Sequence, residues 1–143
     1  MAEKGKILAI EDDPEMVEFI KTILEAHSYK FYSAPTQKEG LEKVKEVSPD
    51  LIILDIMLET KGAGFWAAEK LKSKDPNSEF KEYSNVPILI ITAIHTQTEF
   101  RFSPETDREY LPVDDFAEKP IKPKELIEKL EKLLKGQGQE PSK

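Results

Sequence analysis

The sequence predicts an α/β fold, in which a parallel β-sheet is covered by helices on both faces. Short apolar runs at residues 6–10, 50–54 and 86–91 are rich in branched side chains, as in strands that are buried on both sides. Strand-like segments alternate with segments of helical spacing five times along the chain. No repeat or low-complexity segment interrupts this alternation, which indicates parallel strands joined by right-handed crossovers.

Length and composition exclude several classes of protein. The 143 residues suffice for one compact domain, with 34% charged and 38% hydrophobic residues. The formal net charge of -7 argues against a nucleic-acid binder, which would carry a basic patch. The sequence contains no apolar run long enough to cross a membrane, and no cysteine for disulfides or thiol chemistry. We therefore expect a cytoplasmic protein that binds neither nucleic acid nor membrane.

The first strand is expected at residues 6–10 and the first helix from Pro14 to about His27. Proline suits the first helical turn because its missing N–H would have no partner there. Asp13 stands just before the helix, where capping and the helix dipole explain an acidic residue better than a metal role does. The predicted core face of this helix comprises Met16, Phe19, Ile20, Ile23 and Leu24.

The second strand, at residues 29–33, is partly polar, and we expect it near an edge of the sheet. Thr36 is the predicted N-cap of the next helix, with Glu39 three residues later completing a capping box. The buried face of that helix is predicted to comprise Leu41, Val44 and Val47.

The third strand, at residues 50–54, ends at Asp55. A loop at residues 59–64 then leads into a third helix that contains Phe65, Ala68 and Leu71, with the adjacent Trp66 partly exposed. Residues 73–85 are polar and are expected to form an extended loop.

The fourth strand, at residues 86–91, leads into Thr92. Residues 94–113 follow no clean period, so that a short helix is expected among them without a defined position. The fifth strand is predicted at residues 114–118, directly before Lys119.

The final helix is predicted at residues 124–135, with Gly136 ending it. The polar tail at residues 136–143 is expected to be disordered.

Polar groups follow four of these strands: Glu11 and Asp12, then Asp55, Thr92 and Lys119. All carboxyl ends of a parallel sheet lie along one edge, where open α/β sheets bind ligands. Carboxylates about 5 Å apart would repel by roughly 3 kcal/mol per pair at an effective dielectric near 20. Mg²⁺ would offset this repulsion, because it takes carboxylate and phosphate oxygens as ligands. The set suits transfer of a phosphoryl group onto a carboxylate, with a lysine and a hydroxyl near its oxygens.

Four segments resemble the signature segments of the response regulator receiver domain, and the likeness extends over roughly residues 5–135. The segments are KILAIEDDP (6–14), DLIILDIM (50–57), PILIITA (87–93) and FAEKP (116–120). The resemblance implies a flavodoxin-like (βα)5 three-layer sandwich, with five parallel strands in the order 2-1-3-4-5 and helices on both faces. It also implies one receiver domain at residues 1–135, followed by the tail.

By this resemblance Asp55 is the phosphoacceptor. Mg²⁺ would be held by Asp12 directly, by Glu11 through water, by Asp55 and by the backbone carbonyl of Met57.

Three more residues receive roles from the same resemblance. Thr92 would be the switch hydroxyl, Lys119 the lysine that pairs with the phosphate, and Phe116 the aromatic switch residue. Phe116 has no hydroxyl and would therefore act by packing alone.

The implied function is a phosphoacceptor switch of a two-component, histidine-to-aspartate phosphorelay. The domain would take a phosphoryl group from a sensor histidine kinase or a phosphotransfer protein, and would signal by contact with an unknown downstream protein. We expect a stand-alone receiver that is no enzyme, except that it catalyses its own phosphorylation and dephosphorylation.

Two other functions compete with this one. A receiver-like interaction module that is never phosphorylated would be expected to lack one of the site residues, and none is missing. A hydrolase with an aspartate nucleophile would need a second acid two residues later, where Met57 stands. In the receiver family that position and Ile94 flank the approach of water, so we also expect slow self-dephosphorylation.

Overall fold

The computed structural model describes residues 5–56, 70–73, 75–92, 115–118 and 121–138. Its sheet contains five strands in the order β2-β1-β3-β4-β5, and every neighbouring pair is parallel. This order and orientation confirm the predicted topology. The strands are β1 (Gly5–Ile10), β2 (Tyr29–Ala34), β3 (Leu51–Ile56), β4 (Ile88–Thr92) and β5 (Asp115–Glu118).

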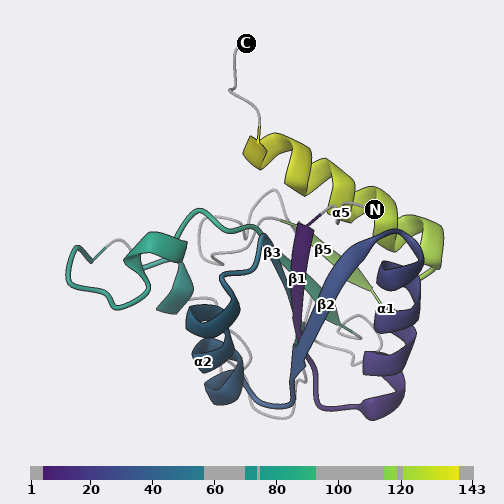
Figure 1. Ribbon diagram of the computed structural model, residues 1–143, viewed down its shortest axis with the longest axis horizontal. Helices are drawn as coiled ribbons and strands as arrows, with labels where there is room; N and C mark the ends of the chain where they lie inside the picture. Colours follow the sequence, from purple (N-terminus) through teal and green to yellow (C-terminus); the bar gives the residue numbers. More distant parts are fainter. Residues whose placement is uncertain (1–4, 57–69, 74, 93–114, 119–120, 139–143) are drawn as a thin grey trace, which may run out of the picture.

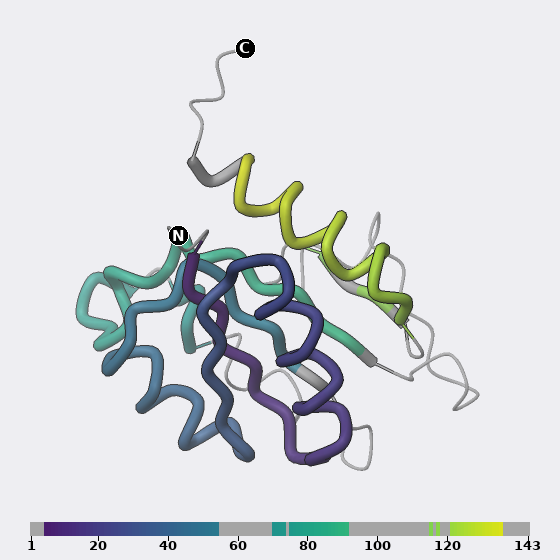
Figure 2. Tube along the Cα trace, turned by 45° about the vertical axis from the view of Figure 1, so that its right-hand side comes forward, coloured from purple at the N-terminus to yellow at the C-terminus, as the bar shows by residue number. Residues whose placement is uncertain are grey.

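Helices cover both faces of the sheet (Figure 1). Helices α1 (Pro14–Ala26) and α5 (Pro123–Gly138) lie on one side, where Figure 2 shows α5 running alongside α1. Helix α2 (Gln37–Val47) lies on the other side. None of the helices that the structure describes combines the length and the apolar character needed to span a membrane.

The predicted end of the last helix was wrong. We expected Gly136 to stop it, but α5 continues to Gly138, so the helix includes the first residues of the expected tail. Glycine lowers helix stability without forbidding helical geometry, and a helix needs a further signal to stop at it.

Two separate apolar layers form the core, one on each face of the sheet. Successive residues of β1 alternate between them, so that Leu8 and Ile10 belong to the α2 layer, and Ile7 and Ala9 to the α1/α5 layer. All four side chains are buried. The central strands are therefore apolar on both sides, as parallel strands between two helical layers must be.

Helix α2 lies very close to β1 because it contains Gly40. A Cβ atom at residue 40 would be 2.4 Å from Cδ1 and 2.6 Å from Cγ1 of Ile10. The missing side chain thus lets the helix rest directly on the last residue of β1. Thr36 caps α2 as predicted, with its hydroxyl oxygen accepting the Glu39 N–H at 3.1 Å.

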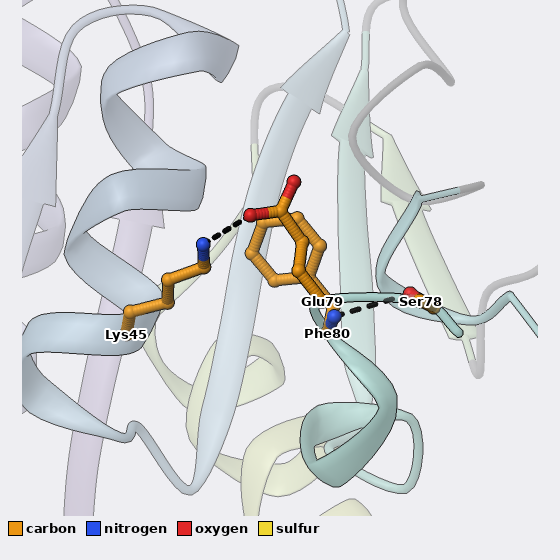
Figure 3. Close-up of polar contacts among 4 residues, drawn as sticks. All are labelled: Lys45, Ser78, Glu79 and Phe80. Atoms are coloured by element: carbon orange, nitrogen blue, oxygen red, sulfur yellow. Dashed lines mark hydrogen bonds and ion pairs between the residues drawn. The ribbon is translucent and has the colours of Figure 1, made fainter. Parts of the chain in front are cut away.

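The stretch predicted as an extended loop is partly structured and contributes to the core. It includes the 3-10 helix η2 (Lys81–Tyr83), and Phe80 just before it is only 4% exposed within the α2 layer. The Phe80 N–H donates to the hydroxyl of Ser78 at 3.1 Å, and Lys45 of α2 forms an ion pair with Glu79 (Figure 3). The aromatic residue in this polar stretch therefore marks a core contact.

Strand β2 lies at an edge of the sheet, as expected. Leu71, which was expected in the third helix, is buried in the α2 layer. Most of the expected third helix, with Trp66, and the segments 59–64 and 94–113 lie outside the described residues.

Candidate functional site

The register of the sheet brings the strand ends that lead to the predicted site residues to one edge. Ile10 of β1 is opposite Leu54 of β3, so that Glu11 and Asp55, which follow them, stand at the same level on neighbouring strands. Strands in a sheet are about 4.8 Å apart, which places these two backbones side by side.

Strands β4 and β5 reach the same edge one residue beyond this level, because Asp55 itself is opposite Ile91. Thr92 is opposite Ile56 on one side and Glu118 on the other. Lys119, the next residue along the chain, lies outside the described residues. The backbone thus brings the carboxyl ends of β1, β3, β4 and β5 to one edge of the sheet, as the predicted strand order requires.

Glu11 is a buried acid at this edge, and it is only 4% exposed. Its main-chain N–H donates to the carbonyl of Ala34 at 2.9 Å, which continues the pairing of β1 with β2 by one residue. Its carboxylate oxygen Oε2 accepts the main-chain N–H of Asp13, also at 2.9 Å. A buried carboxylate is tolerated only with such hydrogen bonds or with a cation beside it.

Asp12 and Asp13, the two acids that follow Glu11, are exposed. Asp12 stands between Glu11 and the start of α1. Asp13 is the N-cap of α1, because its Oδ1 atom accepts the main-chain N–H of Glu15 at 3.0 Å. The capping role predicted for Asp13 is therefore confirmed.

The structure describes the remaining predicted residues only in part. Asp55, Thr92 and Phe116 have their backbones in β3, β4 and β5, respectively. Met57 and Lys119 lie outside the described residues, so their roles stay predictions. Within the part of the chain that the structure describes, no three acidic or histidine side chains gather closely enough to form a complete metal site by themselves.

The acid pair has the chemistry that Mg²⁺ requires. Glu11 and Asp12 supply hard carboxylate oxygens, one from a buried side chain and one from an exposed side chain. Mg²⁺ is commonly held by one or two carboxylates together with water and phosphate oxygens. The described part of the site therefore fits the metal expected from the sequence.

Sequence reasoning missed the backbone groups that fix Glu11. These groups are the carbonyl of Ala34 and the N–H of Asp13. Every residue has a main-chain carbonyl and every residue except proline has an N–H, so the residue type does not reveal such a partner. The Asp13–Pro14 pair was the available signal, because it marks where the helix begins and the backbone must turn.

Comparisons with known proteins agree with this arrangement. The family model of the response regulator receiver domain matches residues 7–131. The DNA-binding response regulator MtrA of Mycolicibacterium smegmatis is 27% identical over 97% of this chain, which spans 54% of that protein. The hybrid signal transduction histidine kinase D of Dictyostelium discoideum is 30% identical over 92% of the chain, which spans 8% of it.

A solved structure supports the same fold. The CheY-like response regulator receiver domain protein from Methanospirillum hungatei JF-1 superimposes with a TM-score of 0.73 at 24% identity, covering 96% of this chain and 97% of that one. The chain spans about half the length of MtrA, so the DNA binding in that name belongs to the longer protein. With its strand order, its acid pair and a family match over most of its length, the chain belongs to the response regulator receiver domain family of two-component systems.

Proposed function

We propose that this domain is a phosphoacceptor switch in which Asp55 receives a phosphoryl group from a phosphohistidine. The observation that carries the proposal is the register of β1 and β3, which sets Glu11 level with Asp55 on neighbouring strands. A buried acid beside the acceptor strand is what a carboxylate-phosphorylating site needs in order to hold a cation.

The transfer makes one bond and breaks another. A carboxylate oxygen of Asp55 attacks the phosphorus, while the bond between phosphorus and the donor's imidazole nitrogen breaks. The imidazole keeps the electron pair and takes up a proton. Catalysis of this step consists mainly of positioning and of stabilising charge on the equatorial oxygens.

The chain's own residues divide the remaining tasks. Glu11 and Asp12 would hold Mg²⁺ together with Asp55 and the carbonyl of Met57. When bound, this ion would neutralise charge on the phosphoryl oxygens. Lys119 would pair with one of those oxygens, and Thr92 would donate its hydroxyl to another.

The signal would leave the domain through a protein contact. Thr92 and Phe116 lie on the neighbouring strands β4 and β5, so that a movement of Thr92 would be transmitted to Phe116 through the paired strands. The phosphoryl donor would be a sensor histidine kinase or a phosphotransfer protein, and the receiver of the signal a further protein. The domain would catalyse no reaction other than its own phosphorylation and dephosphorylation.

Phosphorylation from a small donor tests the proposal. The wild-type protein, incubated with acetyl phosphate and Mg²⁺, should gain one phosphoryl group by intact mass, and chelation of the metal should prevent it. Asp55→Asn should gain none. Asp75→Asn is the matched control, because it removes an exposed carboxylate from a different part of the structure. Full labelling of Asp55→Asn would refute the assignment, and an unlabelled wild type would favour the phosphorylation-independent interaction module.

A further inference from the structure

Asp13 connects the acid pair to helix α1 through two hydrogen bonds of its own. Its main-chain N–H donates to Oε2 of Glu11 at 2.9 Å, and its side-chain Oδ1 accepts the N–H of Glu15 at 3.0 Å. One residue thus holds the buried carboxylate with its backbone and the first turn of the helix with its side chain.

We propose that Asp13 is a positioning residue of the metal site, which orients the Glu11 carboxylate by capping α1. This role rests on the proposed function, since it concerns the Mg²⁺ that Glu11 and Asp12 would hold. Asp13 itself need not touch the metal. Its contribution is to fix the direction of the N–H that Glu11 accepts.

The capping bond sets that direction. Asp13 has the extended conformation of an N-cap, with φ of −88° and ψ of 113°. The following Pro14 has a fixed φ and no N–H, so the side chain of Asp13 reaches past it to Glu15. Without the side-chain oxygen, the backbone at residues 12–13 can adopt other conformations, and the N–H no longer points steadily at Glu11.

Burial makes Glu11 dependent on this donor. At 4% exposure, its carboxylate cannot exchange the Asp13 N–H for bulk water. The neighbouring Asp12 is exposed and can turn toward a cation by itself. The capped backbone therefore matters for one acid of the pair more than for the other.

The experiment separates the cap from the charge. Asparagine caps a helix as well as aspartate does but carries no charge, whereas alanine loses both properties. Asp13→Asn and Asp13→Ala lose the same charge, so the ratio of their dissociation constants for Mg²⁺ isolates the cap. We expect Asp13→Ala to bind Mg²⁺ about fivefold more weakly than Asp13→Asn, measured by calorimetric titration.

Thr36→Ala is the matched control. It removes the same kind of bond from the N-terminus of α2, where Thr36 accepts the Glu39 N–H at 3.1 Å. We expect it to lose stability as Asp13→Ala does, but to bind Mg²⁺ like the wild type. A fall in affinity equal to that of Asp13→Ala would mean that affinity simply follows stability, and would overturn the positioning role.

Amide exchange in the metal-free protein gives a second readout. The N–H of residue 13 should exchange slowly in the wild type and in Asp13→Asn, and faster in Asp13→Ala. Equal exchange rates, or equal Mg²⁺ affinities, in the two Asp13 variants would overturn the positioning role alone. A wild-type protein that binds no Mg²⁺ would overturn the proposed function together with it.

Discussion

The Nζ atom of Lys45 lies 4.9 Å from the centre of the Phe80 ring, above a buried side chain of the α2 layer. The same lysine forms an ion pair with Glu79, so that two neighbouring residues of the segment before β4 are held by one residue of α2 (Figure 3). The hydrogen bond from Lys45, and then its charge, lower the pKa of the Glu79 carboxyl, and Lys70 adds to this effect.

The ring and the charge contribute unequally to this contact. Phe80→Ala should lower the free energy of unfolding by about 3–5 kcal/mol, because it empties a buried site. Lys45→Met should have a much smaller effect, since both partners of its ion pair are exposed and water screens them. Urea denaturation of the two variants measures the difference. A larger loss for Lys45→Met would mean that the ion pair, not the ring, fastens this segment to α2.

Filling the space at Gly40 should destabilise the protein. Alanine would favour the helix by about 1 kcal/mol, but overpacking against buried Ile10 should cost about 1–3 kcal/mol. We expect a net loss for Gly40→Ala in urea denaturation.

A second substitution tests the cause of that loss. Ile10→Val removes Cδ1, the atom that a Cβ at residue 40 would approach most closely. The double variant should therefore lose less free energy of unfolding than the two single variants lose in sum. Simple additivity would show that the two residues do not compete for the same space.

Alkaline pH should weaken the fold through Tyr29. Burial, and then the charge of Glu131, raise the pKa of its phenol above the usual value of 10.0. Above that pH the unfolded chain ionises first, so the stabilising contribution is complete below pH 10 and is lost as pH rises through the folded pKa.

Tyr29→Phe removes this titration. Unfolding free energies at pH 8 and near pH 11 should show a smaller alkaline loss for the variant than for the wild type. Identical losses would indicate that other groups, such as lysines, account for the whole effect.

The two exposed acids should differ in their importance for Mg²⁺. Asp12→Ala should weaken Mg²⁺ binding by more than about tenfold, because it removes a ligand, whereas Asp13→Ala should cause a smaller loss, because it acts only through the cap and the charge. The metal-free Asp12→Ala protein should also be more stable than the wild type, because a carboxylate beside buried Glu11 is gone. Equal losses of Mg²⁺ affinity would place the acid pair in a different register.

The phosphorylated state should be long-lived. Met57 and Ile94, which the receiver resemblance places beside the path of the attacking water, are bulky and offer no useful hydrogen bond. Met57→Asn combined with Ile94→Glu should speed phosphate loss about tenfold, equivalent to about 1.4 kcal/mol in the barrier. Intact mass after removal of the donor follows the decay. Decay of the wild type within seconds, or no acceleration in the double variant, would contradict this expectation.

The sequence predicted those features that depend on local pattern. Apolar runs located the strands, and short polar signals located the caps at Asp13 and Thr36. Right-handed crossovers make neighbouring strands parallel, and this alone predicts that Glu11 and Asp55 lie at the same edge of the sheet.

Features that depend on partners far along the chain escaped prediction. Phe80 stands in a polar stretch, and its burial depends on α2, more than thirty residues earlier. The need for glycine at residue 40 arises from Ile10, whose side chain occupies the place that a Cβ atom there would take. The end of α5 was missed because a glycine can be accommodated within a helix.

The two-sided burial of β1 has a consequence for how its alignment is encoded. Ala9 and Ile10 are both apolar and both buried, so a pattern of apolar and polar residues does not decide which of them faces α2. Side-chain volume does decide it. A strand displaced by one residue would bring the small Ala9 beneath Gly40 and leave a void, and it would turn Ile10 into the opposite layer, which would then be overpacked. Side-chain volumes therefore select the alignment of β1. The size of Ile10 in this way also determines where Glu11, the next residue, is placed.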